Sequence, residues 1–202
     1  MHHKFLEFGL LLSDWKCITA ILIIAYLFVD KDRFIIAICL EVFAISFNGY
    51  MKTLFKIPLN AKIFSVDDGW AFPSGHTQSL AMILMYICWY YRKSYVILGS
   101  TIMFLYAVIS IEYFGYHTWI DIIGGFVSAL IVFVLFISAL KFFKPSVEVS
   151  CFVCLVFASL LQIKLSLVSK LSYAHFYYCT AGASSFLCFR LIRSRKQREI
   201  TK

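Results

Sequence analysis

Residues 118–140 read TWIDIIGGFVSALIVFVLFISAL, and this stretch decides the fold class. Asp121 is its one charged residue, and the other positions are apolar or small. A helix needs about 20 such residues to cross the hydrocarbon core of a bilayer. Because lipid offers no partner for backbone polar groups, a segment of this kind spans the membrane as an α-helix. The stretch therefore predicts a transmembrane helix over 118–140.

The same pattern recurs along the chain. Apolar segments predict further spans over 15–30, 34–53, 75–91, 95–113, 149–168 and 171–190. The segment 4–13 is apolar but too short to span, so we expect it to lie along the membrane interface. No linker or repeat divides the chain. We therefore predict an all-α, polytopic transmembrane helical bundle of about six to seven spans. Residues 1–202 form a single membrane domain, with the bundle over 15–190 and a basic cytoplasmic tail over 191–202.

The composition supports the same fold class. Hydrophobic residues make up 61% of the 202 residues, and charged residues make up 15%. Soluble domains usually carry about 25% charged residues, so this chain has too little polar surface for a water-soluble globule. The net charge is +8, but the basic residues gather at the ends of apolar segments. Since no basic face with interleaved polar residues is present, we expect no nucleic acid partner.

The distribution of basic residues predicts an orientation. Twelve of the 19 lysines and arginines fall in the connections at 31–33, 92–93 and 141–144 and in the C-terminal tail. By the positive-inside rule this side is cytoplasmic. The connections 54–74 and 112–117 then lie on the opposite side. We expect a multi-pass protein of the plasma (inner) membrane whose functional loops face the non-cytoplasmic side.

Two short motifs stand at the start of spans on this outer side. PSGH occupies residues 73–76, and HTWID occupies residues 117–121. A helix N-terminus offers unpaired N–H groups and a partial positive charge, which together suit a phosphate group. Ser74 is a residue type that caps such a terminus. Two converging termini of this kind would hold one phosphate from two sides.

The histidines of these motifs suit phosphoryl transfer. His117 and Asp121 are four residues apart and share one helix face, so the carboxylate can accept a hydrogen bond from Nδ1 and leave Nε2 as a nucleophile. His76 is then the second acid/base group. The alternative is structural: an imidazole that anchors the chain at the interface, and a His–Asp pair that forms only a hydrogen bond.

Together the motifs resemble the type-2 phosphatidic acid phosphatase superfamily. That family's pattern is Lys-x6-Arg-Pro, then Pro-Ser-Gly-His, then Ser-Arg-x5-His-x3-Asp. Here PSGH is followed by GYHTWIDIIGG at 115–125, and the resemblance covers residues 48–126. It implies a phosphatidic acid phosphatase/haloperoxidase-like core and hydrolysis of lipid phosphates or diphosphates without a metal or other cofactor.

The resemblance also implies a catalytic role for each matching residue. His117 would attack phosphorus and form a phosphohistidine, Asp121 would orient His117, and His76 would be the general acid. The expected partners are therefore a lipid phosphate substrate and the bilayer. No obligate protein partner is inferred.

The sequence departs from the family pattern at both arginines. Leu59-Asn60 stands where the first block has Arg-Pro, and Ile111 follows Ser110 where the third block has arginine. Arginine offers a bidentate fork that lysine lacks, so we expect nearby lysines to act as point charges instead. The expected substrate-binding set is Lys52, Lys56, Lys62, Ser74, Gly75 and Ser110.

Three readings of function follow from this sequence. The leading one is a membrane phosphatase that acts on a lipid-linked phosphate at the outer face. The second is a phosphotransferase that moves a phosphate or phospho-head-group between lipids. The third is a non-catalytic lipid-binding or transport protein that has lost the arginines that hold phosphate. Acidic residues near the site, Asp67, Asp68 and Glu112, either repel phosphate or bind an amine-bearing head group.

Overall fold

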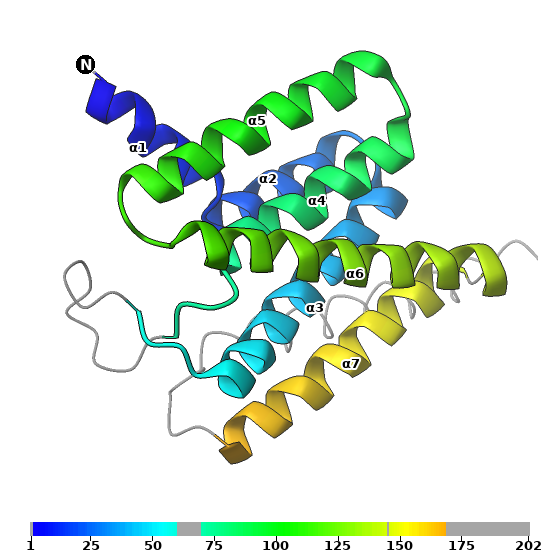
Figure 1. Ribbon diagram of the computed structural model, residues 1–202. Coiled ribbons are helices and arrows are strands. Elements are labelled where there is room, and N and C mark those ends of the chain that lie inside the picture. Colours follow the sequence, from blue (N-terminus) through cyan, green and yellow to red (C-terminus); the bar gives the residue numbers. More distant parts are fainter. Residues whose placement is uncertain (1, 60–69, 145, 169–202) are drawn as a thin grey trace, which may run out of the picture.

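The computed structural model describes residues 2–59, 70–144 and 146–168, and over these residues the chain is helical (Figure 1). The helices are, in chain order, α1 (His2–Leu12), α2 (Trp15–Phe28), α3 (Lys31–Phe55), α4 (Gly75–Tyr91), α5 (Ser94–Tyr113), α6 (Trp119–Phe143) and α7 (Val147–Val168). The ends of α2 to α7 fall within three residues of six predicted spans. The predicted span 171–190 and the tail 191–202 lie outside the described residues.

The described helices differ in their capacity to cross a membrane. Among the described residues, α3, α5, α6 and α7 are long and apolar enough to span, and α1 and α2 together make a fifth candidate with a bend of 62°. The α4 helix has 17 residues, which gives a length of about 25 Å, at the lower limit for a span. The all-α architecture is confirmed. The number of six to seven spans and the interfacial position of 4–13 stay predictions.

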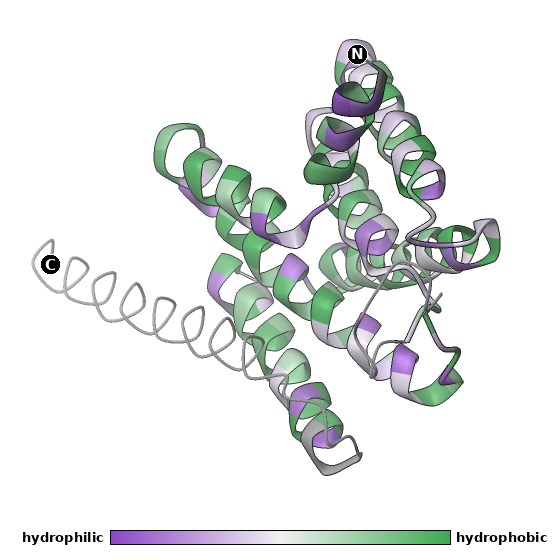
Figure 2. Cartoon of the chain, turned by 90° about the vertical axis from the view of Figure 1, so that its left-hand side faces the viewer, coloured by the Kyte–Doolittle hydropathy of each residue, from purple (hydrophilic) through white to green (hydrophobic). Residues whose placement is uncertain are grey.

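The outward faces of the helices are apolar. On α5, Leu98, Ile102, Leu105 and Ile109 recur at helical spacing, and each is more than half exposed. Figure 2 shows hydrophobic residues along most of the helix surfaces, with a concentration of hydrophilic residues near the start of the chain. Exposed apolar faces of this extent suit contact with lipid tails. The chain thus has the surface of an integral membrane protein.

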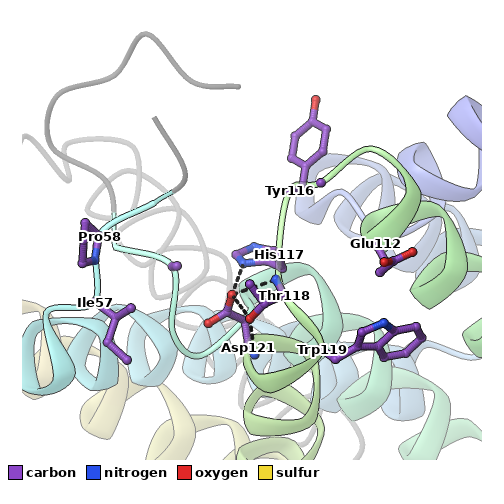
Figure 3. A pocket seen from close by; sticks show the side chains of 10 residues that line it. Ile57, Pro58, Glu112, Tyr116, His117, Thr118, Trp119 and Asp121 are labelled. Atoms are coloured by element: carbon purple, nitrogen blue, oxygen red, sulfur yellow. Dashed lines mark hydrogen bonds and ion pairs between the residues drawn. The ribbon is translucent and has the colours of Figure 1, made fainter. Parts of the chain in front are cut away.

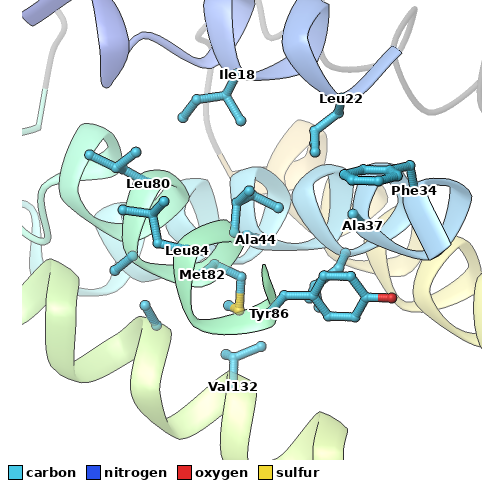
Figure 4. Close-up of a cluster of buried hydrophobic side chains, with 14 of the residues drawn as sticks. Ile18, Leu22, Phe34, Ala37, Ala44, Leu80, Met82, Leu84, Tyr86 and Val132 are labelled. Carbon is cyan, nitrogen blue, oxygen red and sulfur yellow. The ribbon is translucent and has the colours of Figure 1, made fainter. Parts of the chain in front are cut away.

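The α4 helix lies at the centre of the bundle and contacts α2, α3, α5 and α6. Its Leu80 packs in a buried cluster with Leu22 of α2, Ala44 of α3 and Val132 of α6 (Figure 4). Lipid tails are as apolar as these side chains, so close packing stabilises the arrangement more than removal from water does. This packing fixes the N-terminal turn of α4, which carries the PSGH motif.

Candidate active site

Two histidines meet at one end of the bundle. His76 lies in the first turn of α4, and His117 lies in the connection between α5 and α6. Their ring centroids are 6.0 Å apart. This distance joins the ring centres, and a phosphate group that bridges the two rings would touch a nitrogen of each. The two imidazoles are therefore within reach of one phosphate group.

The N-termini of α4 and α6 meet directly beside these rings. Ser74 caps α4 with its hydroxyl, which accepts from the backbone N–H of Thr77. The backbone N–H of Ser74 donates to the carbonyl oxygen of Asp121 at 2.9 Å. Thr118 caps α6 in a reciprocal capping box with Asp121. Two helix termini with partial positive charge thus converge on one place.

Close packing and buried hydrogen bonds hold these turns in place. A Cβ added to Gly125 would lie 2.5 Å from the carbonyl oxygen of Ser74, so only glycine permits this approach of α6 to α4. Behind the turns, the Asn48 amide and the Ser128 hydroxyl donate to Oε1 of Gln78 at 2.8 Å and 2.9 Å. These bonds join α3, α4 and α6 in apolar surroundings, where polar groups need partners.

Asp121 is buried beside His117 but forms no hydrogen bond with it. Asp121 Oδ2 lies 3.9 Å from His117 Nδ1, which is longer than a hydrogen bond. Within the described ranges, that nitrogen has no hydrogen-bond partner. Asp121 Oδ2 instead accepts from the backbone N–H and the hydroxyl of Thr118, at 2.9 Å and 2.8 Å. The expected His–Asp bond is replaced by the helix cap, and the orienting role of Asp121 stays a prediction.

The environment of His117 keeps its ring neutral. Burial lowers the pKa of His117 to about 3, and the charges of Lys52 and His76 add to this lowering. Burial and like charges disfavour the protonated form of the ring. At neutral pH the His117 imidazole therefore carries a proton on only one of its two nitrogens. A neutral imidazole retains the lone pair that a nucleophile needs.

The predicted lysines occupy different places. Lys52 lies half-buried in the last turn of α3, where its charge acts on His117. Lys56 is exposed and ends α3 in the left-handed conformation, with φ of 51°. Lys62 lies outside the described residues, as do Asp67 and Asp68. Lys52 is therefore the described lysine that the fold brings to the histidines.

Ser110 and Ile111 face the protein interior. The Ser110 hydroxyl donates to the carbonyl oxygen of Tyr106 at 2.9 Å, and its side chain packs against Gly9 of α1. Ile111 is fully buried in an apolar cluster with Ile122. The structure does not bring Ser110 to the pocket beside His117, whereas Gly75 lies at the start of α4 next to His76.

A pocket of about 500 Å³ opens beside His117 (Figure 3). This volume lies in the usual range for small-molecule sites. The pocket is lined by Ile57, Pro58, Ala71, Glu112, Gly115, Tyr116, His117, Thr118, Trp119 and Asp121. The sequence did not indicate Ala71, because this residue meets the pocket through a tertiary contact: its N–H donates to the Ile57 carbonyl oxygen at 2.7 Å and so joins the two ends of a long connection. In the described part of the chain, no group of three or more His, Cys, Asp or Glu side chains is placed to hold a metal ion.

Comparison with known families gives one match. The family model of the PAP2 superfamily matches residues 43–145, which is more than half of the chain. The matched stretch begins within α3 and ends just after α6, so it contains Lys52, His76, His117 and Asp121. No curated protein and no solved structure matches the chain.

Proposed function

The chain belongs to the PAP2 superfamily, and on this premise we propose that it is a membrane phosphatase that hydrolyses a lipid-linked phosphate or diphosphate through a phosphohistidine intermediate. The observation that carries the proposal is the pair of imidazoles, 6.0 Å apart, at the joined N-termini of α4 and α6. A neutral, buried His117 facing a second imidazole suits a nucleophile and its acid/base partner.

In the first step, a ring nitrogen of His117 attacks phosphorus. The N–P bond forms while the P–O bond to the lipid breaks, and protonated His76 donates its proton to the leaving oxygen. The phosphate oxygens lie against the N-terminal N–H groups of α4, including that of Gly75, and against the Lys52 ammonium. Such fixed donors stabilise the charge that develops on the transferring phosphoryl group.

In the second step, water attacks the phosphohistidine. His76, now neutral, takes a proton from the water as the new P–O bond forms and the N–P bond breaks. Inorganic phosphate leaves, and both histidines return to their starting states. His117 is the nucleophile in this cycle, His76 the acid and then the base, and Asp121 the group that limits the rotation of His117.

The count of basic residues supports a site on the non-cytoplasmic face of the plasma membrane. By sequence, twelve of the 19 lysines and arginines fall in the connections at 31–33, 92–93 and 141–144 and in the C-terminal tail, and the positive-inside rule assigns these segments to the cytoplasmic side. A lipid substrate then reaches the histidines from the outer leaflet.

Two further functions remain candidates on specific observations. The site lacks the two arginines with which the family holds phosphate, and Ile111, at one of these positions, is buried in the apolar core. The loss of these arginines supports transfer of the phosphoryl group to a second lipid in place of water. The same loss supports a non-catalytic lipid-binding or transport protein. The neutral His117 beside His76 favours catalysis over that last function.

Phosphate release from a panel of lipids tests this proposal. We expect the purified protein in nanodiscs to release phosphate from at least one of phosphatidate, phosphatidylglycerol phosphate and undecaprenyl diphosphate. Loss of the general acid in His76→Gln is expected to lower that rate by about 10²- to 10⁴-fold. Added lipid alcohols test transfer, since a transferase would form new phospholipid in their presence.

His3→Gln is the matched control, because this imidazole pairs with Glu7 at 3.0 Å on the exposed face of α1. Its rate should equal that of the wild type. Full activity of His76→Gln on every substrate would show that the assigned acid takes no part in the reaction. Absence of turnover on the whole panel, together with no binding of vanadate, would instead support the non-catalytic function.

A further inference from the structure

One wall of the pocket beside His117 is anionic and aromatic. Glu112 comes from the last turn of α5, and Trp119 comes from the first turn of α6. Figure 3 shows both side chains on the same side of His117, away from Ile57 and Pro58. Both are exposed, Trp119 to 52%. A carboxylate and an indole that line one pocket are a combination that recognises organic cations.

The side-chain charges around the pocket are mixed. Glu112 and Asp121 line the pocket with negative charge, and Lys52 is the described lysine whose charge reaches His117. A phosphate monoester carries about −1.5 to −2 charges at neutral pH, which the charge of Lys52 does not balance alone. A phosphodiester carries a single negative charge, and an attached amine cancels that charge.

From this charge pattern we propose that the substrate is a phospholipid whose phosphate carries a cationic amine head group, such as ethanolamine or choline. The phosphate lies between His76 and His117, and the ammonium lies against Glu112 and the ring of Trp119. The inference rests on the proposed phosphohistidine chemistry and extends it from lipid phosphates to a phosphodiester substrate. A head group whose amine is two carbons from the phosphate oxygen fits within the 500 Å³ of the pocket.

The chemistry of such a substrate follows the same steps. A nitrogen of His117 bonds to phosphorus, the P–O bond to the lipid alcohol breaks, and His76 protonates the leaving oxygen. The phospho-head-group is then held on His117. Water or the hydroxyl of a second lipid attacks phosphorus, gives its proton to His76 and breaks the N–P bond. One product is a lipid alcohol. The other is the phosphorylated amino alcohol when water attacks, or a new phospholipid when a second lipid attacks.

Glu112→Gln tests this assignment with substrates that differ only in the amine. Phosphatidylethanolamine and phosphatidylethanol share the same phosphodiester, but phosphatidylethanol lacks the amine. We expect the wild type in nanodiscs to cleave phosphatidylethanolamine or phosphatidylcholine with a kcat/KM at least tenfold above that for phosphatidylethanol, measured as diacylglycerol release. Glu112→Gln should remove most of this preference by slowing only the amine-bearing substrates. Trp119→Leu should act in the same direction, with its greater effect on phosphatidylcholine.

Glu7→Gln, an exposed glutamate on α1, is the matched control and should leave the preference unchanged. Phosphatidate separates this inference from the proposed function. Cleavage of phosphatidate without any preference for amines, or a preference that survives Glu112→Gln, overturns the substrate class and leaves the phosphatase proposal intact. If the wild type cleaves none of these lipids or the earlier panel, both proposals fall.

Discussion

Replacing His117 by alanine is expected to lower turnover of every lipid substrate by about 10⁴-fold or more, because removal of a covalent nucleophile eliminates the intermediate itself. The remaining helix termini and Lys52 can still bind a phosphate, so affinity should change far less than kcat. Steady-state turnover of the purified variant in nanodiscs measures both quantities.

The His117 side chain is 4% exposed, so its removal leaves a cavity that a small imidazole fits. Free imidazole added to His117→Ala should therefore recover part of the lost turnover. His117→Gln fills the space without a comparable nucleophile and should show no such recovery. Wild-type turnover by His117→Ala, in protein that elutes as a single species, would rule out the nucleophile assignment.

The second large effect is expected from Gly125→Ala. The added Cβ would lie 2.5 Å from the backbone carbonyl oxygen of Ser74, so the N-terminal turns of α4 and α6 must move apart. A displacement of about 1 Å between reacting groups can cost about 10²-fold in rate. We therefore expect a loss of that order in kcat, together with a lower midpoint of thermal unfolding.

Gly99→Ala on α5 is the matched control for this change. A Cβ at Gly99 has no atom within 4 Å, and alanine favours the helix over glycine. The control should keep full activity and an equal or higher unfolding midpoint. Equal behaviour of Gly125→Ala and Gly99→Ala would mean that contact between the two helix termini does not position the histidines.

The sequence predicts most of the described fold because each helix carries its own signal. The stretch over 118–140 is apolar enough to specify α6 alone, and PSGH marks the start of α4 through a capping serine. The alternation of helix directions then places both histidine motifs at one end of the bundle. Their 6.0 Å separation depends on packing at Gly125, where the sequence indicates close helix packing but not the contact with Ser74.

The hydrogen bonds of the site depend on which donors compete for each acceptor, and the spacing of residues in the sequence does not show the outcome. The i to i+4 spacing predicts a bond from His117 to Asp121, but Thr118 offers the same carboxylate two nearer donors and completes the helix cap. Ser110 matches a family position, yet it packs against Gly9 of α1. That contact joins residues a hundred positions apart, and no local pattern contains it.

The central claim is that phosphorus becomes covalently bonded to His117. Rapid alkaline quenching of the wild type during turnover of a substrate labelled at phosphorus, followed by mass spectrometry of the peptides, tests it directly. We expect a label on the His117 imidazole that is stable in alkali, is lost in acid and is absent from His117→Ala. A label on another residue, or steady turnover by wild-type protein that never carries the label, would contradict it.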